Sequence, residues 1–219
     1  MARELKTGRA EPQSGKATSV VAFLHGYGAN GADLLGLSQP LAPYLPGTLF
    51  LAPDAPEPCA GVPMGRQWFP IPWIDGSSEA ASRAGMAKAV EDLNAWIDGV
   101  LAETGLAPER MVLFGFSQGS MMSLHVGPRR AAPLGGIVAF SGRLLDPLQL
   151  GPETQSRMPV MLVHGNADEV VPHAAMAEAG DALTANGFTV YAHTMDGTGH
   201  GIDPDGLSVA LAFLRDVLG

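Results

Sequence analysis

The segment Gly115-Phe116-Ser117-Gln118-Gly119 places a serine between two glycines that lie two residues to either side of it. This G-x-S-x-G spacing is typical of a nucleophile elbow, a tight turn that presents a serine hydroxyl between a strand and a helix. Residues 110–114 are largely apolar and predict the strand, and residues 120–126 predict the helix. Ser117 is therefore the predicted nucleophile, and the alternative is a serine that only caps the helix.

A serine nucleophile needs an imidazole beside it and a carboxylate that orients the imidazole. In the fold that carries this elbow, the chain order is serine, acid, histidine, and this order selects among the six histidines. His200 lies in a glycine-rich loop between the last expected strand and the last expected helix, and it is the predicted base. Asp168 follows the strand expected at residues 160–163 and is the predicted acid. The alternatives are Asp196, four residues before His200, as the acid and a purely turn-forming role for Asp168.

The developing negative charge of the reaction needs hydrogen-bond donors, which form an oxyanion hole. One donor in this fold is the backbone N–H of the residue after the nucleophile, here Gln118. The other comes from an early loop after a strand, and Leu24-His25-Gly26-Tyr27-Gly28 fits this description. The backbone N–H of Tyr27 is the predicted second donor, and the alternative for His25-Gly26 is a plain turn.

Apolar runs and helical patterns alternate along most of the chain, and this alternation indicates βαβ units and a parallel sheet. In such sheets the reactive site lies at the carboxyl ends of the strands, where every motif above falls. The sequence predicts an α/β-hydrolase fold with a mainly parallel twisted sheet, helices on both faces and a minimal cap. Strands are expected at residues 19–24, 48–52, 110–114, 136–140, 160–163 and 188–194.

We expect residues 1–17 to form a flexible N-terminal lead-in or a short edge strand, and residues 18–219 to form a single α/β-hydrolase domain. Residues 53–77 are rich in proline and predict a long irregular segment, which in compact domains is usually functional. Five large apolar residues are candidates for the wall of a substrate pocket, with ordinary core packing as the alternative: Trp68, Phe69, Trp73, Leu144 and Leu145.

The composition excludes several classes of partner. Hydrophobic residues make up 46% of the chain, charged residues 16%, and the formal net charge is −9. Binding to nucleic acid needs basic clusters, so no nucleic-acid partner is expected. No apolar run reaches the length of a membrane span, so no stable membrane insertion is expected. Residues 1–16 are polar and show no signal peptide, which favours a cytoplasmic location.

Taken together, the motifs resemble those of the phospholipase/carboxylesterase family, which includes the acyl-protein thioesterases and small bacterial carboxylesterases. The most specific element is Phe116-Ser117-Gln118-Gly119, and the resemblance runs from about residue 19 to the C-terminus. It implies Ser117, Asp168 and His200 as a catalytic triad, and Tyr27 and Gln118 as amide donors. It implies no cofactor and no metal.

The sequence therefore predicts a serine carboxylesterase that hydrolyses short-to-medium acyl carboxylic esters through an acyl-enzyme. The predicted partner is a small-molecule acyl ester or thioester, and a homodimer is left open. One alternative is an acyl-protein thioesterase or lysophospholipase as the main activity. The other is a non-catalytic binding protein with the hydrolase fold.

Overall fold

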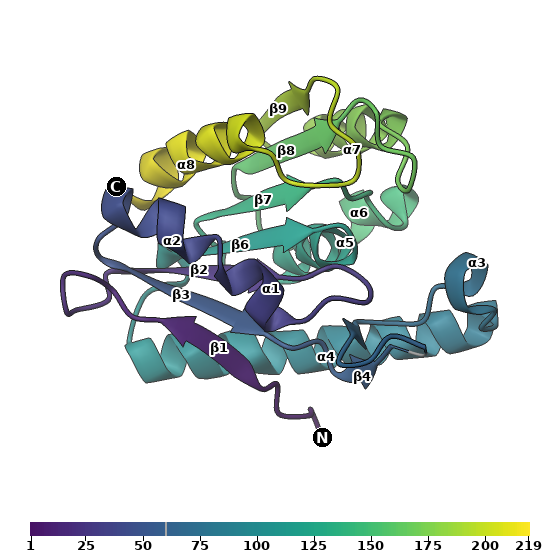
Figure 1. The fold of residues 1–219 in the computed structure, drawn as a ribbon, viewed down its shortest axis with the longest axis horizontal. Coiled ribbons are helices and arrows are strands. Elements are labelled where there is room, and N and C mark those ends of the chain that lie inside the picture. The colour runs from purple at the N-terminus through teal and green to yellow at the C-terminus, as the bar shows by residue number, and fades with distance from the viewer. Residues whose placement is uncertain (60) are drawn as a thin grey trace.

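Seven strands form the central sheet of the computed structural model, which describes residues 1–59 and 61–219 (Figure 1). Their order is β1-β3-β2-β6-β7-β8-β9, and every neighbouring pair is parallel except β1 and β3. This mostly parallel sheet confirms the predicted fold class. The strands are β1 (Thr7–Ala10), β2 (Ser19–Leu24), β3 (Thr48–Pro53), β6 (Met111–Phe116), β7 (Gly136–Phe140), β8 (Val160–Gly165) and β9 (Val190–Met195).

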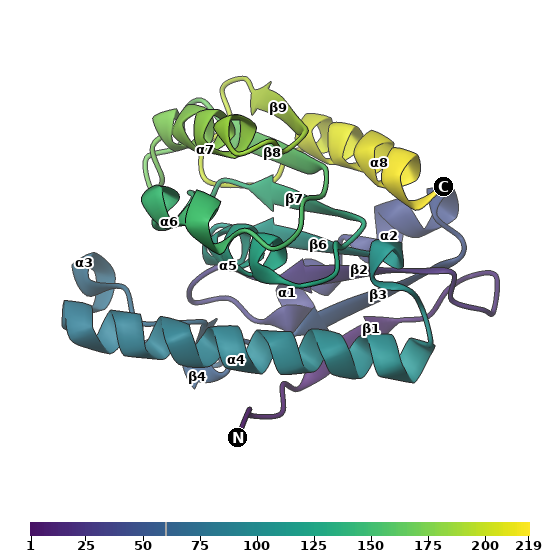
Figure 2. The same cartoon turned by 180° about the vertical axis from the view of Figure 1, so that it is seen from behind.

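Helices cover both faces of the sheet (Figures 1 and 2). One face packs against α1 (Gly31–Leu35), α2 (Ser38–Leu41) and α8 (Pro204–Leu218), and the other against α4 (Glu79–Thr104), α5 (Gln118–Val126), α6 (Pro147–Glu153) and α7 (Ala174–Ala185). Successive strand residues point to opposite faces of the sheet and pack in separate apolar cores. Phe23 and Phe114 pack on the side of α8, whereas Ala22 and Leu113 pack on the side of α4. Among the described residues, no helix combines the length and apolar character needed to cross a membrane.

Local sequence sets where these helices begin and end. The Ser78 hydroxyl accepts a hydrogen bond from the Ala81 amide at the start of α4, and Gly105 closes the helix with a left-handed φ of 67°. The helical pattern at residues 33–45 contains Pro40 and Pro43 and is broken into α1, α2 and a short 3₁₀ helix at Ala42–Tyr44. Two further 3₁₀ helices lie at Pro108–Arg110 and Gly127–Arg129.

Hydrogen bonds and buried side chains, among them Trp68, hold the described residues of the proline-rich segment 53–77. It contains a two-stranded sheet, β4 (Glu57–Pro58) and β5 (Arg66–Gln67), and the short helix α3 (Pro72–Asp75). The Arg66 guanidinium donates to the carbonyls of Ala55 and Pro56, at 2.8 Å each. The Gly28 amide donates to the Arg66 carbonyl at 2.9 Å, so this segment is fastened to the loop after β2.

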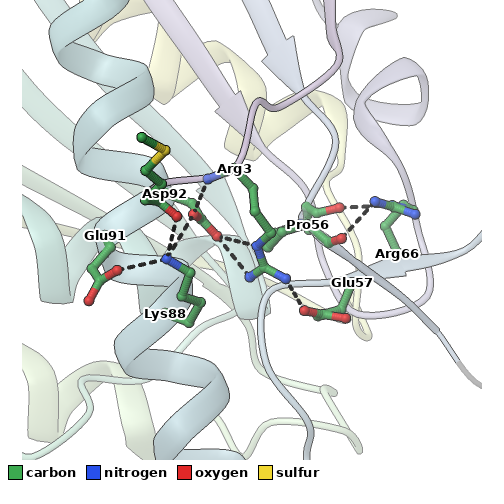
Figure 3. A network of polar contacts seen from close by, with 9 residues as sticks. Arg3, Pro56, Glu57, Arg66, Lys88, Glu91 and Asp92 are labelled. Atoms are coloured by element: carbon green, nitrogen blue, oxygen red, sulfur yellow. Dashed lines mark hydrogen bonds and ion pairs between the residues drawn. The ribbon is translucent and has the colours of Figure 1, made fainter.

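The N-terminal segment is held in place, and of the two alternatives for residues 1–17 the structure contains the edge strand. β1 pairs with β3, and Arg3 lies between α4 and β4 (Figure 3). The Arg3 side chain forms ion pairs with Glu57 and with Asp92, whose side chain is fully buried. A short polar segment gave no apolar pattern from which these contacts could be predicted.

Candidate active site

Ser117 lies at the sharp turn between β6 and α5, with a φ of 54° that L-residues rarely adopt. The turn is possible because its flanking glycines carry no side chain. A Cβ on Gly119 would overlap the Leu24 carbonyl of β2, and a Cβ on Gly115 would overlap the backbone at Gly119 and Ser120. The Ser117 amide donates to the Phe140 carbonyl of β7 at 2.8 Å, which anchors the turn to the sheet.

The three residues predicted as a triad lie together at the carboxyl ends of the strands. His200 Nε2 is 3.0 Å from Ser117 Oγ, and His200 Nδ1 is 2.7 Å from Asp168 Oδ2. The loop that carries His200 packs closely on the end of β8, where a Cβ on Gly165 would overlap the Thr198 carbonyl. The alternative acid Asp196 bonds instead to the Asn166 side chain.

The environment of Asp168 favours its ionised form. Burial raises the pKa of this carboxyl, but the hydrogen bond from His200 and the amides of Val171 and Val170 outweigh it and hold the pKa below the usual range. Those amides donate to Asp168 Oδ1 at 2.9 and 2.8 Å. His164 Nε2 lies 3.2 Å from Asp168 Oδ2 and 2.9 Å from the Val171 carbonyl, so it borders the same carboxylate.

The two predicted oxyanion donors have free backbone N–H groups. Within the described part of the chain, neither the Tyr27 amide nor the Gln118 amide donates to a backbone or side-chain acceptor. The N–H of Gln118 lies at the N-terminus of α5, where the helix dipole favours negative charge.

His25 fixes the peptide that carries the Tyr27 amide. Its side chain is completely buried, and burial lowers its pKa, so the ring is neutral. Nδ1 lies 2.8 Å from the Gly26 carbonyl, and Nε2 accepts from the Ala55 amide at 2.9 Å, which places the single ring proton on Nδ1. Because carbonyl and N–H point in opposite directions in a trans peptide, this bond orients the Tyr27 N–H.

The Gln118 side chain has a role that the sequence did not reveal. It accepts from the Trp68 amide at 2.9 Å and donates to the Phe69 carbonyl at 2.7 Å. Trp68 Nε1 donates in turn to the His25 carbonyl at 3.0 Å. The Trp68-Phe69 dipeptide therefore lies in the core behind the elbow. Its hydrogen bonds connect the two segments that carry the predicted oxyanion donors, one at Gln118 and the other at His25 to Tyr27.

An apolar pocket of about 360 Å³ opens onto the Ser117 hydroxyl and His200. Of the five predicted wall residues, only Trp73 lines it. Trp68 and Phe69 are buried core residues, Leu144 is buried beneath α6 and α7, and Leu145 packs against the α4 core, so the prediction is corrected at these four positions. The remaining lining residues are Tyr27, Ile71, Ile74, Met121, Arg143, Val170, Val171 and Pro172.

Four of the lining residues that the sequence analysis did not predict could have been found from their positions in the sequence. Val170, Val171 and Pro172 are the second to fourth residues after the acid, and Met121 lies one helical turn after Ser117 on the same helix face. Ile71 and Ile74 belong to the N-cap and the single turn of α3, and Arg143 lies in a loop, so none of them is in an element long enough for periodicity to give an orientation. In the described residues, no cluster of three or more His, Cys, Asp or Glu side chains is arranged to hold a metal ion.

A mostly parallel sheet, a strained serine between strand and helix, and a histidine and aspartate on later loops define an α/β-hydrolase. The sequence model of the phospholipase/carboxylesterase family matches residues 7–218, and the chain belongs to this family. It is a serine hydrolase of carboxylic esters, as the following relatives also indicate.

Acyl-protein thioesterase 1 of Mycosarcoma maydis is 32% identical to this chain, over 98% of each protein. Esterase YpfH of Escherichia coli is 30% identical, over 91% of this chain and 83% of the relative. Among solved structures, esterase PE8 is 41% identical and superposes with a TM-score of 0.93, over 99% of this chain and 100% of that protein.

Proposed function

We propose that this chain hydrolyses esters through an acyl-enzyme on Ser117, with His200 as the general base and Asp168 as the group that orients it. The observation that carries the proposal is the continuous hydrogen-bond chain from Ser117 Oγ through both ring nitrogens of His200 to Asp168. These two hydrogen bonds meet the requirement for an activated nucleophile, and the Ser117 hydroxyl faces a pocket large enough for a small acyl group.

The proposed reaction has two similar halves. Ser117 Oγ attacks the acyl carbonyl while His200 Nε2 takes its proton, and the amides of Tyr27 and Gln118 stabilise the oxyanion. The intermediate collapses, and the leaving alcohol or thiol takes the proton from His200. Water then attacks the acyl-enzyme by the same route and releases the acid. Asp168 keeps the Nδ1–H tautomer of His200 and stabilises its charged form.

The pocket supports short-to-medium acyl chains, because its walls are apolar and its volume is about 360 Å³. A second candidate is thioester or lysophospholipid hydrolysis. The relatives named acyl-protein thioesterase 1 support the first, and the phospholipase in the family's description supports the second. The carbonyl chemistry is the same for oxygen and sulfur esters. A panel with matched acyl groups on an alcohol, a thiol and a lysophospholipid would separate the candidates.

The test of the proposed function is hydrolysis of p-nitrophenyl esters of graded acyl length by the wild type and by Ser117→Ala. We expect the variant to lose activity by about a millionfold in kcat, since loss of the nucleophile removes the covalent route. Activity retained above about a hundredth of wild type would overturn the assignment. A wild type inactive on every ester would instead favour a binding protein.

The homodimer and the cytoplasmic location stay proposals based on the sequence. Analytical ultracentrifugation of the purified chain over a range of concentrations tests the first. A mass that stays at 22.7 kDa throughout contradicts a dimer.

A further inference from the structure

Arg143 is the one permanently charged side chain among the described residues that line the pocket with Ser117 and His200. It follows a turn at the end of β7 in which Ser141 has a φ of 48°. A Cβ on Gly142 would clash with the Ser120 side chain and lie 3.1 Å from the Ser117 carbonyl. The backbone before Arg143 is therefore pressed against the elbow, and this fixes where the side chain begins.

The Arg143 guanidinium has no ion-pair or hydrogen-bond partner within the described residues, and it is exposed at the pocket. Arg129 and Arg130 each bind a carboxylate, and Arg157 binds a backbone carbonyl. Arg83 and Arg215 also lack a side-chain partner within the described residues, but neither lines the pocket with Ser117. An unengaged guanidinium offers a planar fork of N–H donors that matches a carboxylate or a phosphate.

Because the whole molecule is negatively charged, a cation in the pocket indicates the kind of substrate that the pocket binds. The net charge of −9 repels an anionic substrate, and most other walls of the pocket are apolar. A neutral acyl chain needs no cation at this position. An ester that carries its own negative charge needs one, because neither the apolar walls nor the overall field would attract it.

We propose that Arg143 is an anion subsite and that this esterase prefers esters bearing a carboxylate or phosphate a few bonds from the reacting carbonyl. The proposal rests on the proposed function, since the subsite acts on an ester attacked by Ser117. The anion is carried either on the acyl part, as in a half-ester of a dicarboxylic acid, or on the alcohol part, as in a glycerol phosphate ester.

Two matched pairs of substrates distinguish these sources. Monomethyl adipate and methyl hexanoate share the acyl length and differ in the terminal carboxylate. Hexanoyl glycerol 3-phosphate and monohexanoyl glycerol differ in the phosphate on the alcohol. For each pair, the readout is the ratio of kcat/KM for the charged ester to kcat/KM for the neutral ester.

We expect Arg143→Gln to lower this ratio about tenfold in at least one pair, a size typical of one charge-assisted contact open to water on one side. Arg143→Lys should retain part of the preference. The control is Arg215→Gln, an equal change of charge at the opposite end of the sheet, where Arg215 lines a hollow at the start of β2 and β3. This control should keep the wild-type ratio within twofold. Raising the salt concentration should lower the ratio in the wild type but not in Arg143→Gln.

Equal ratios for wild type and Arg143→Gln in both pairs would overturn the anion subsite. The proposed function would still stand in that case, provided that the wild type hydrolyses the neutral esters and Ser117→Ala does not. An equal fall of the ratio in Arg215→Gln would also overturn the proposal, because it would show a general field effect. A wild type inactive on all four esters would overturn the anion subsite, and the proposed function would fall with it only if the p-nitrophenyl esters were not hydrolysed either.

Discussion

His25 shows how a side chain outside the triad contributes to the reaction geometry. Its two ring nitrogens hold the Gly26 carbonyl and the Ala55 amide, at 2.8 and 2.9 Å. The first bond orients the peptide whose N–H we propose as an oxyanion donor. The sequence placed His25 in the loop expected to supply an oxyanion donor but gave its side chain no role, because tautomer and bond direction depend on Ala55, which lies thirty residues later in the chain.

The two bonds of His25 can be separated by substitution. His25→Asn keeps a donor near the place of Nδ1, and His25→Gln keeps an acceptor near the place of Nε2. We expect His25→Gln to lose about 10- to 100-fold in kcat with little change in KM, because the Tyr27 amide is no longer fixed. His25→Asn should lose less kcat but more stability, since the Ala55 amide is left unpaired. Steady-state kinetics and thermal unfolding of both variants test this, and equal losses of kcat contradict it.

The residue scale also shows where sequence patterns were insufficient. Ser117, Asp168 and His200 could be selected because local glycine patterns and chain order constrain them. The pocket wall could not, because Trp68 and Phe69 are apolar whether they line a cavity or pack in a core. Their place was decided by the Gln118 side chain, which holds their backbone behind the elbow.

At the scale of elements, the crossing of β2 and α5 depends on Gly119. Its position leaves no room for a Cβ beside the Leu24 carbonyl, and the backbone on both sides belongs to the core. We expect Gly119→Ala to destabilise the fold by about 3 kcal/mol, the upper end of the usual cost of overpacking, because the atom in the way is backbone. The control is Gly99→Ala in α4, where a Cβ meets no atom within 4 Å. This control should stabilise the helix by about 0.5–1 kcal/mol. Urea unfolding of both variants measures the difference, and a mild effect at Gly119 contradicts the account.

The Arg3 network makes a second prediction at this scale. Arg3 pairs with Asp92, whose side chain is fully buried, and with Glu57 of β4. Arg3→Ala would leave Asp92 with a more distant ion pair, to Lys88 at 3.8 Å. We expect a loss of about 1–3 kcal/mol in the free energy of unfolding, below the range for a fully buried pair. Arg9→Ala is the control, because Arg9 pairs with the exposed Glu11 and Glu103, and it should cost under about 1 kcal/mol. Equal losses would show that the buried partner makes no difference.

The order of strands and helices was largely predictable from the sequence, since buried runs of apolar residues and capping residues such as Ser78 and Gly105 are local signals. The edge strand β1 and the short helix α6 were less predictable. β1 is short and polar, and it forms because β3 offers a free edge. α6 contains Pro152, and a proline inside a short segment argues against a helix there.

For the whole molecule, buried histidines predict how stability depends on pH. Burial lowers the pKa of His25, His164 and, to about 4, His125. In the unfolded chain each has a pKa near 6.5, so below that pH the unfolded state binds protons that the folded state does not. The free energy of unfolding should therefore fall as pH decreases from about 6.5 to 5.

Chemical unfolding at several pH values tests this expectation. His125→Gln should reduce the slope by up to one proton, because one such group is removed. A stability that is flat between pH 7 and 5 contradicts the burial of these rings as neutral groups.

The central claim is that Ser117 is the activated nucleophile of this esterase. The most direct measurement is labelling of the wild type with a fluorophosphonate, followed by peptide mass spectrometry to locate the adduct. We predict a single adduct on Ser117, and no labelling of the folded Ser117→Ala variant. An adduct on Ser120 or Ser141, or labelling that persists in Ser117→Ala, would contradict the account.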